Sequence, residues 1–333
     1  PTTVFETLRQ TVDANLPLLH RFVTLRKKIL GVSEVHSYDL YVPLVDEIDF
    51  EITYDKAKEI VLAALAPLGP DYVAIVQKAF DERWIDVVEN KGKRSGAYSS
   101  GTYDTNPFIL LNWQDNLNNV YTLAHEMGHS VHSYLTRHNQ VYHYGDYPIF
   151  LAEIASTTNE SLLTDYLLKT NEDPNFQAYV LNQYLDGFKG TVFRQTQFAE
   201  FEDWIHEQSA QGQALTADKM SAYYGELNQK YYGKDLFPDE EIAYEWTRIP
   251  HFYYNYYVYQ YATGEAAATT LADRIINNDG AQDYKTYLKA GSSDYPLNVI
   301  AKAGVDMNHS DYLKQAFSVF ESRLNQLESL LVK

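Results

Sequence analysis

Apolar residues recur at intervals of three and four from residue 2 to about residue 90, which is the spacing of one face of an α-helix. The first such series is Leu8, Val12, Leu16 and Leu19. Segments that contain proline or glycine interrupt the pattern near residue 43 and at residues 67–70. We therefore expect several helices in this part of the chain, separated by short breaks.

The pattern changes at residues 92–114, where glycine, serine, threonine and tyrosine are frequent. An apolar run follows Pro107, and the segment as a whole is typical of two short strands joined by a loop. Helical spacing resumes after Asn116 and continues to the end of the chain, with breaks at residues 143–148, 231–241, 277–282 and 290–296. The sequence thus predicts a mainly α fold with one small β-ribbon.

Composition narrows the possible functions. The chain has 333 residues, of which 45% are hydrophobic and 14% aromatic, enough for a substantial core. It has no cysteine, which excludes disulfides, iron–sulfur clusters and thiolate zinc sites and leaves histidine and carboxylates as metal ligands. With 27 basic and 45 acidic residues the formal charge is −18, which disfavours nucleic acid and anionic membranes as partners.

The first residues of the chain and the length of its apolar runs indicate where in the cell the protein is located. The sequence has no run of 18 or more apolar residues, and its start lacks the pattern of a signal peptide. We therefore expect a cytoplasmic protein. The chain begins with Pro1 instead of methionine, which indicates a part of a longer protein.

Candidate chemistry centres on the motif His125-Glu126-Met127-Gly128-His129. On a helix, His125 and His129 project from one face, so both imidazoles can bind one Zn²⁺, while Glu126 can take a proton from a metal-bound water. Apolar residues before and after the motif predict a buried face on the same helix. The alternative is an ordinary helix with a pair of surface histidines.

A catalytic zinc needs a third protein ligand and an open position for water. Glu153 is the candidate, because it lies among apolar residues of a second predicted helix, where a carboxylate is costly to bury unless it is paired or binds a metal. Glu160 shares its face and is either an acceptor that orients a ligand imidazole or a solvated helix residue. His132 is a further neighbour, predicted to lie behind the ligands or to face substrate.

A third segment, from Tyr244 to Tyr261, contains seven tyrosines. If it is helical, His251, Tyr254 and Tyr257 are three apart and share one face. Their N–H and O–H groups could stabilise the oxyanion that forms when water attacks a peptide carbonyl. The alternative is a helix whose aromatic rings serve packing, which we expect for Tyr253, Tyr256 and Tyr259.

Three motifs together resemble the oligoendopeptidase F branch of the thimet-oligopeptidase family of zinc metallopeptidases. They read H-E-M-G-H-S, then F-L-A-E-I-A-S-T-T-N-E, then I-P-H-F-Y-Y-N-Y-Y-V-Y-Q-Y-A-T-G. The similarity extends to R-S-G-A-Y-S-S-G-T-Y-D-T-N-P-F-I-L-L-N-W upstream and to A-G-S-S-D-Y-P-L-N-V-I-A-K-A-G-V-D-M downstream, and covers about residues 90 to 310.

The resemblance implies a helical, zincin-like body with a deep substrate channel, one zinc ion per chain and short oligopeptides as substrates. The implied zinc ligands and general base are His125, His129, Glu153 and Glu126. The implied groups that stabilise the transition state are His251, Tyr257 and Tyr254. Family members are longer, so residues 1–91 are expected to be the remnant of an N-terminal channel wall and residues 92–333 the catalytic domain, with its ribbon at residues 92–114.

The predicted activity is therefore hydrolysis of short, unstructured peptides by a water molecule activated by zinc and Glu126. An exposed edge of the ribbon could bind substrate backbone, or the ribbon could be a structural hairpin. Two other readings stay open. The chain could be a peptide-binding fragment that keeps zinc but has lost turnover through truncation, or a helical scaffold that carries the motif by chance.

Overall fold

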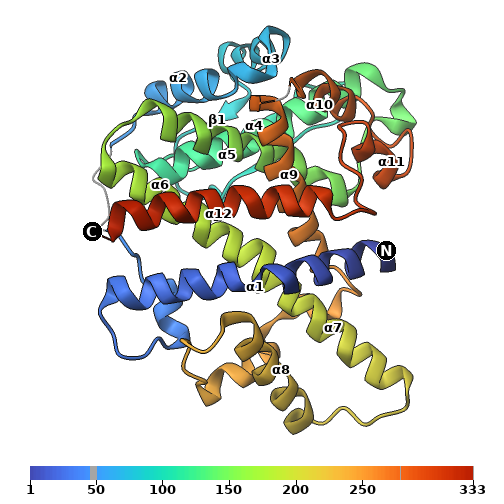
Figure 1. Cartoon of the computed structure of the whole chain (residues 1–333). Coiled ribbons are helices and arrows are strands. Elements are labelled where there is room, and N and C mark those ends of the chain that lie inside the picture. Colours follow the sequence, from blue (N-terminus) through green and yellow to red (C-terminus); the bar gives the residue numbers. More distant parts are fainter. Residues whose placement is uncertain (46–50, 278, 333) are drawn as a thin grey trace. The chain divides into compact units, whose positions relative to one another are not determined.

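A computed structural model describes residues 1–45, 51–277 and 279–332 of the chain. It is mainly helical and divides into two compact units, neither of which is one continuous segment (Figure 1). The first unit comprises Pro1–Glu47, Pro174–Ala266 and Asn308–Lys333, and the second comprises Ile48–Asp173 and Ala267–Met307. The predicted boundary between residues 91 and 92 falls inside the second unit, and that functional division of the chain stays a prediction.

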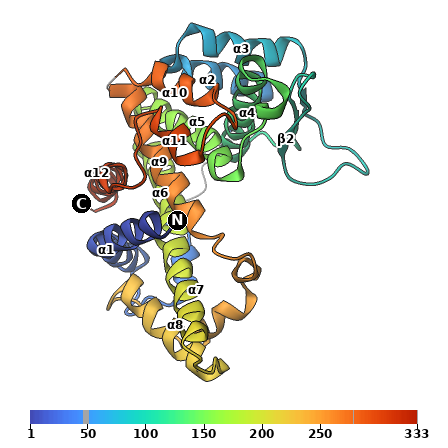
Figure 2. The ribbon, with the colours of Figure 1, turned by 90° about the vertical axis from the view of Figure 1, so that its right-hand side faces the viewer.

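Long helices form the first unit. They are α1 (Thr2–Leu30), α6 (Pro174–Phe188), α7 (Arg194–Ala210), α8 (Ala217–Tyr232), α12 (Asp311–Leu331) and the first part of α9 (Tyr259–Asn277). A π-helical turn, η4 (Lys189–Phe193), joins α6 to α7, and the 3₁₀ segments are η1 (Ser37–Tyr41), η5 (Glu240–Arg248) and η6 (Pro250–Tyr253). The helices α7 and α8 contact each other and lie side by side (Figure 2).

Apolar side chains on these helices meet in one core, as their spacing predicts. The series Leu8, Val12, Leu16 and Leu19 of α1 is buried. Phenylalanine rings of α1, α6, η4 and α12 stack edge-on beside it, namely Phe22, Phe188, Phe193, Phe317 and Phe320. Helix α1 ends where Gly31 adopts φ 66°, a conformation that glycine adopts at little cost.

The second unit holds the predicted metal helix. Its helices are α2 (Tyr54–Ala64), α3 (Pro70–Asp81), α4 (Leu117–Asn139), α5 (Ile149–Thr170), α10 (Ala281–Leu288) and α11 (Pro296–Ala301), together with the end of α9 and the turns η2 (Ala66–Leu68) and η3 (Tyr142–Tyr144). The helices α4 and α5 contact each other along their length (Figure 1). None of the helices in the described part of the chain is long and apolar enough to cross a membrane.

A small sheet accompanies α4. Strand β2 (Tyr98–Ser100) pairs antiparallel with β3 (Phe108–Leu110), which confirms the predicted ribbon, and both strands contact α4. A third strand, β1 (Ile85–Asp86), pairs parallel with β3, giving the order β1-β3-β2. The sequence pattern missed β1 because two residues are too short to show alternation. Strand β2 lies at one edge of the sheet.

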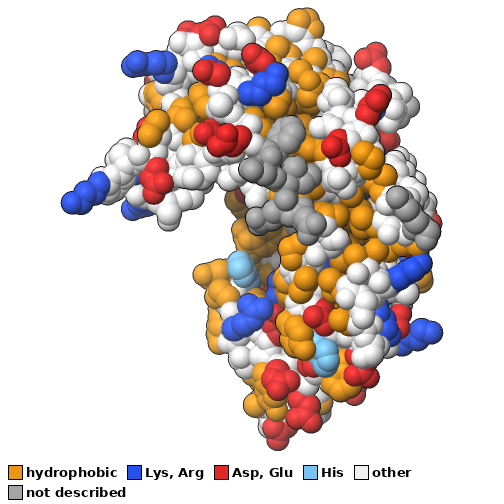
Figure 3. Space-filling view, turned by 90° about the vertical axis from the view of Figure 1, so that its left-hand side faces the viewer, with side chains coloured by type: hydrophobic (Ala, Val, Ile, Leu, Met, Phe, Trp, Pro, Cys, Tyr) orange, Lys and Arg blue, Asp and Glu red, His pale blue; other side chains and the backbone are white. Residues whose placement is uncertain are grey.

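Tyrosine makes up much of the exposed apolar surface. Side chains of this type with high exposure include Tyr38, Tyr41, Tyr142, Tyr253, Tyr254 and Tyr295. On the face drawn in Figure 3, hydrophobic, acidic and basic side chains are interspersed. Tyrosine therefore contributes to the surface of the molecule, and one of these exposed tyrosines, Tyr254, belongs to the predicted site.

Candidate metal centre and active site

Helix α4 presents both motif histidines from one face. It begins at Leu117, where the side chain of Asn116 accepts a hydrogen bond from the backbone N–H of Asn119 at 3.0 Å, as an N-cap residue does. Its buried face consists of Leu117, Val120, Leu123, Ala124, Met127 and Val131. The rings of His125 and His129 lie one turn apart with centroids 4.8 Å from each other. The helix thus supplies two imidazoles directed at one point.

Gly128 lets α5 approach α4 closely. A Cβ atom at this position would lie 2.6 Å from the Cα of Ser156 and 2.8 Å from the carbonyl oxygen of Ala155, so a side chain cannot be accommodated without a shift. In addition, the side-chain amide of Asn159 in α5 donates to the carbonyl oxygen of Ala124 at 3.1 Å. These contacts set the register of the two helices and bring Glu153 opposite the histidines.

The three predicted metal ligands come together. Glu153 Oε2 lies 3.5 Å from His125 Nε2 and 3.6 Å from His129 Nε2, and the three ligand atoms all lie within 4.8 Å of one another. A tetrahedral zinc with bonds of about 2.0–2.2 Å places its ligand atoms about 3.3–3.6 Å apart. The donor set and its spacing therefore fit a divalent metal such as zinc.

Electrostatics keep the Glu153 carboxylate in the form that metals bind. A hydrogen bond with His129 and the charge of that residue lower the pKa of Glu153, so it is ionised near neutral pH. The Glu153 side chain is 45% exposed, which leaves the site open to solvent. A carboxylate and two imidazoles with one open side are the arrangement of a catalytic metal site rather than a closed structural one.

Glu160 contacts the other face of the His125 ring. Its Oε1 accepts a hydrogen bond from His125 Nδ1, which directs Nε2 of the same ring toward Glu153. Burial lowers the pKa of His125, but the hydrogen bond and charge of Glu160, with Glu126 and Glu153, raise it overall. This contact agrees with the predicted acceptor of the His125 imidazole and not with the solvated helix residue, the other alternative for Glu160.

Glu126 lies beside the triad, and strand β2 of the sheet binds its carboxylate. It is only 7% exposed, and the backbone N–H of Ser99 in β2 donates a hydrogen bond to its carboxylate. Burial raises the pKa of Glu126, an effect that the charges of His125 and His129 partly offset. A raised carboxyl pKa suits a group that accepts and returns a proton near neutral pH. Sequence reasoning missed Ser99, because the contact joins segments 27 residues apart.

His132 is buried, which agrees with the predicted place behind the candidate ligands and not with a position facing substrate. It is 1% exposed, and its ring stacks on Tyr147 with a centroid distance of 3.7 Å. The hydroxyl of Tyr147 in turn bonds Ser133 Oγ at 2.8 Å and the carbonyl oxygen of His129 at 3.4 Å. Burial lowers the pKa of His132 to about 3, so the ring is neutral. It serves packing behind the metal helix.

The predicted donors of the tyrosine-rich segment form an aromatic cluster in the first unit. The His251 ring lies 6.0 Å from the Tyr257 ring and nearly parallel to it, and 5.9 Å from the Tyr254 ring. Tyr261, which sequence reasoning did not single out, joins them with its hydroxyl 3.5 Å from the Tyr257 hydroxyl. The metal triad belongs to the second unit.

The helix expected across this segment is wrong. The segment instead contains the end of the 3₁₀ segment η5 and the 3₁₀ turn η6 (Pro250–Tyr253), and the α-helix α9 begins only at Tyr259. Between them Asn255 and Tyr256 adopt φ values of 52° and 60°, which no right-handed helix contains. The packing role is also wrong for Tyr253, which is 89% exposed, whereas Tyr256, at 41% exposed, still contacts the ring of His206.

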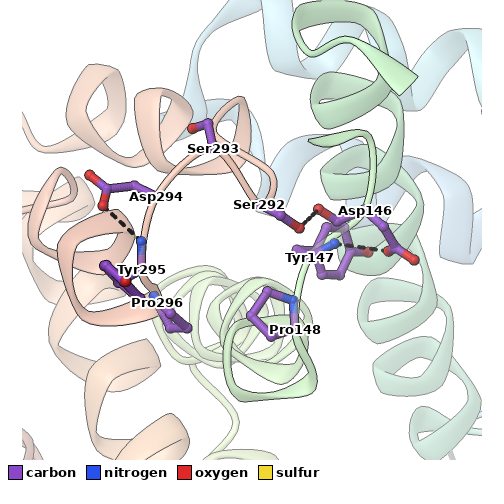
Figure 4. A pocket seen from close by; sticks show the side chains of 8 residues that line it. All are labelled: Asp146, Tyr147, Pro148, Ser292, Ser293, Asp294, Tyr295 and Pro296. Atoms are coloured by element: carbon purple, nitrogen blue, oxygen red, sulfur yellow. Dashed lines mark hydrogen bonds between the residues drawn. The ribbon is translucent and has the colours of Figure 1, made fainter. Parts of the chain in front are cut away.

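A pocket of about 680 Å³ opens where two loops meet at the start of α5 (Figure 4). The hydroxyl of Ser292 donates to the carbonyl oxygen of Asp146 at 2.6 Å and joins the loops. A Cβ at Gly291, which has φ 51°, would lie 2.1 Å from the carbonyl oxygen of Tyr144, so the junction requires glycine. The lining residues are Asp146, Tyr147, Pro148, Ser292, Ser293, Asp294, Tyr295 and Pro296. Tyr147 is thus shared by this pocket and the layer behind the metal triad.

Comparison with known proteins decides the family. Residues 1–319 match peptidase family M3. The chain belongs to this family. It is 59% identical over its whole length to the group B oligopeptidase PepB of Streptococcus agalactiae, and 53% identical to the oligopeptidase PepF of Bacillus subtilis. It spans 56% and 50% of the lengths of these two relatives, respectively.

Solved structures of family M3 peptidases share the fold. A putative peptidase from Chlamydophila abortus aligns with a TM-score of 0.94 at 40% identity, covering 99% of this chain and 56% of that one. Oligoendopeptidase F from Enterococcus faecium aligns with a TM-score of 0.79 at 48% identity, covering 99% of this chain and 53% of that one. The predicted resemblance and the mainly α fold with a small sheet beside the metal helix are therefore confirmed.

Proposed function

We propose that the chain is the catalytic part of a zinc-dependent endopeptidase that hydrolyses short, unstructured oligopeptides. The convergence of His125, His129 and Glu153, with Glu126 beside them, carries this proposal. Membership of peptidase family M3 supports it, as do relatives that are named oligopeptidases. Because the chain spans about half the length of those relatives, its substrates and its activity in isolation belong to the proposal.

Three side chains would hold the metal, namely His125, His129 and Glu153. Glu160 supports this assignment, since a ligand imidazole whose Nδ1–H bonds a carboxylate keeps the lone pair of Nε2 for the metal. When bound, zinc supplies a Lewis acid that polarises the scissile carbonyl and makes water a better nucleophile. One ion per chain satisfies the triad.

Glu126 acts as the general base. It would accept a proton from the attacking water and pass it to the nitrogen of the departing amine. Its burial and raised pKa support this role, because they bring its proton affinity closer to neutral pH. The Ser99 N–H fixes one side of the carboxylate and leaves the other for water.

His251 and Tyr257, with Tyr254 as a second tyrosine, would donate hydrogen bonds to the oxygen on which negative charge develops. Their mutual clustering supports a shared task, as does the 60% exposure of Tyr254, which keeps its hydroxyl accessible. Removal of one such donor typically lowers kcat by about 10²–10³-fold. The position of this cluster relative to bound substrate is part of the proposal.

Backbone groups of strand β2 and of Gly101, the residue after it, bear on how substrate binds. The Ser99 N–H is bound to Glu126, and the carbonyl oxygen of Gly101 accepts from Arg137 at 3.1 Å. These bonds use groups that an added peptide strand would otherwise pair with. They favour the structural alternative for the ribbon, in which β2 fixes the general base.

Digestion of an oligopeptide mixture, read by mass spectrometry with and without a zinc chelator, tests this proposal. We expect internal cleavage of short peptides that stops with chelator. Peptides retained without cleavage would instead support the fragment that binds zinc and peptide but lacks turnover. Absence of stoichiometric zinc after gentle purification would favour a scaffold without metal chemistry.

A further inference from the structure

The segment that joins η6 to α9 has a backbone that needs external support. Asn255 and Tyr256 are consecutive residues with φ values of 52° and 60°. Residues with a side chain rarely adopt this left-handed region, and a pair in succession is costly unless neighbouring structure stabilises it. Tyr254 and Tyr257 flank the pair directly, so their directions depend on it.

Glu202 of α7 provides that support. Its side chain is fully buried, and its Oε1 accepts a hydrogen bond from the backbone N–H of Tyr256 at 2.6 Å. A carboxylate is costly to bury, and Oε2 has no hydrogen-bond partner among the described residues. The fold therefore buries the Glu202 carboxylate in spite of this cost, and its hydrogen bond goes to Tyr256 of the left-handed pair.

A second contact comes from the same face of α7. His206 follows Glu202 by four residues, and its ring lies 4.7 Å from the ring of Tyr256. Helix α7 therefore contacts Tyr256 at two points, because Glu202 binds its backbone N–H and His206 packs against its ring. The rings of Tyr254 and Tyr257 lie 6.2 Å apart, and they lie 5.9 and 6.0 Å, respectively, from the ring of His251.

We propose that Glu202 is a positioning residue that holds the left-handed pair and thereby directs the hydroxyls of Tyr254 and Tyr257. The expected effect of Glu202 on catalysis rests on the proposed function, whereas its expected effect on the backbone does not. The active feature is the hydrogen-bond acceptor at Oε1. Glutamine retains that acceptor and leucine removes it at similar size.

The experiment compares Glu202→Leu, Glu202→Gln and Glu207→Leu in the 333-residue chain. Glu207 is an exposed residue of the same helix and provides the control. Leucine at position 202 replaces a buried charge with an apolar group, which a fold tolerates, so the variant is expected to stay folded. Hydrogen exchange of the peptide that contains the Tyr256 amide is measured first, and kcat and KM for a quenched fluorescent oligopeptide second.

In Glu202→Leu we expect the Tyr256 amide to exchange at least about tenfold faster, because its acceptor is lost. We expect kcat to fall by about 10- to 100-fold with KM within about twofold of wild type, since misdirected donors act in the transition state. Glu202→Gln and Glu207→Leu should match wild type in both measurements.

Wild-type exchange at Tyr256 in Glu202→Leu would overturn the proposal, as would an unchanged kcat in a chain that cleaves the peptide. Equal loss in Glu202→Gln would also overturn it, because the charge and not the acceptor would then matter. If wild type cleaves no peptide while Glu202→Leu still exchanges faster, the proposed function fails and the backbone role of Glu202 stands.

Discussion

Single residues around His125 show how similar carboxylates acquire different tasks. Glu153 reaches the Nε2 atoms of both histidines, whereas Glu160, seven residues later on α5, bonds Nδ1 of His125. A proton shared between Nδ1 and Glu160 leaves the lone pair of Nε2 free, which is the state that binds metal. The direction of each imidazole nitrogen thus decides which carboxylate can be a ligand.

Replacement of Glu160 by alanine tests this division. We expect zinc affinity to fall by about 10- to 100-fold, because the ligand imidazole loses the acceptor that orients it. Asp165→Ala is the matched control, since Asp165 lies on the same helix and pairs with Lys169. Competition with a chelator of known affinity gives the values. Equal affinity in wild type and Glu160→Ala would show that Glu160 does not support the site.

The positions of the candidate ligands and of the candidate base were predictable because one helical motif and one glutamate on the next helix carry them. Ser99, Tyr261 and Glu202 were not, since each acts through a contact made only in the folded chain. Glu202 gave no signal in the sequence, where it is one acidic residue among many on α7. Tertiary contacts of this kind have no fixed spacing along the chain.

At the scale of elements, the metal centre depends on the approach of α4 to α5. Gly128 occupies an unspecified position of the histidine motif, yet a Cβ there would overlap the backbone of Ser156. Helix α10 also holds α5, because the hydroxyls of Tyr284 and Tyr287 donate to the carbonyl oxygens of Ala155 and Leu151 at 3.3 and 2.7 Å. Both α4 and α10 therefore fix the position of α5.

The variant Gly128→Ala should consequently impair both stability and metal binding. We expect the free energy of unfolding to fall by about 1–3 kcal/mol, as for other overpacked sites, and zinc affinity to fall with the displacement of Glu153. Chemical denaturation and chelator competition measure the two effects. In the control Gly187→Ala no atom lies within 4 Å of the new Cβ, so stability should hold or rise. A Gly128→Ala variant as stable as Gly187→Ala would contradict the close approach.

Elements followed the sequence wherever hydrophobic spacing alone determined them. The helices α1 to α5 and the β2–β3 ribbon confirm the pattern read from the chain. The segment from Tyr254 to Val258 departs from the pattern. Its aromatic residues keep the three-residue spacing of a helix, yet the 3₁₀ turn η6 ends at Tyr253. There the backbone is set by its attachment to Glu202 and not by its own periodicity.

At the scale of the whole molecule, stability should depend on pH through Glu202. Burial raises its pKa from 4.5 to about 7, so the folded chain holds this proton more tightly than the unfolded chain. Where the native state binds more protons, stability falls as pH rises, here between about pH 4.5 and 7. Glu202→Gln cannot titrate and should lose this component.

Denaturation of both proteins at pH 5, 6, 7 and 8 measures the difference. We expect the free energy of unfolding of wild type to decline relative to that of Glu202→Gln up to about pH 7 and then to run parallel. In this comparison the contributions of the other acidic groups to the pH dependence cancel, because both proteins share them in a chain with formal charge −18. Parallel curves over the whole range would show that Glu202 is not held with a raised pKa.

The organisation into two interleaved units is the feature that the linear sequence predicted least. Each unit combines segments from distant parts of the chain, and α9 continues from one into the other. The metal triad and Glu126 belong to the second unit, and the aromatic cluster with Glu202 to the first. Metal binding and donor positioning can therefore be tested by separate variants.

Titration of the metal-free chain with zinc, followed by cleavage of a quenched fluorescent oligopeptide, tests the central claim most directly. We predict that activity rises from zero to a plateau at one zinc per chain. We also predict that Glu126→Gln binds the same single zinc and remains at least about a thousandfold less active. Full activity without metal, or full activity of Glu126→Gln with zinc bound, would contradict the account.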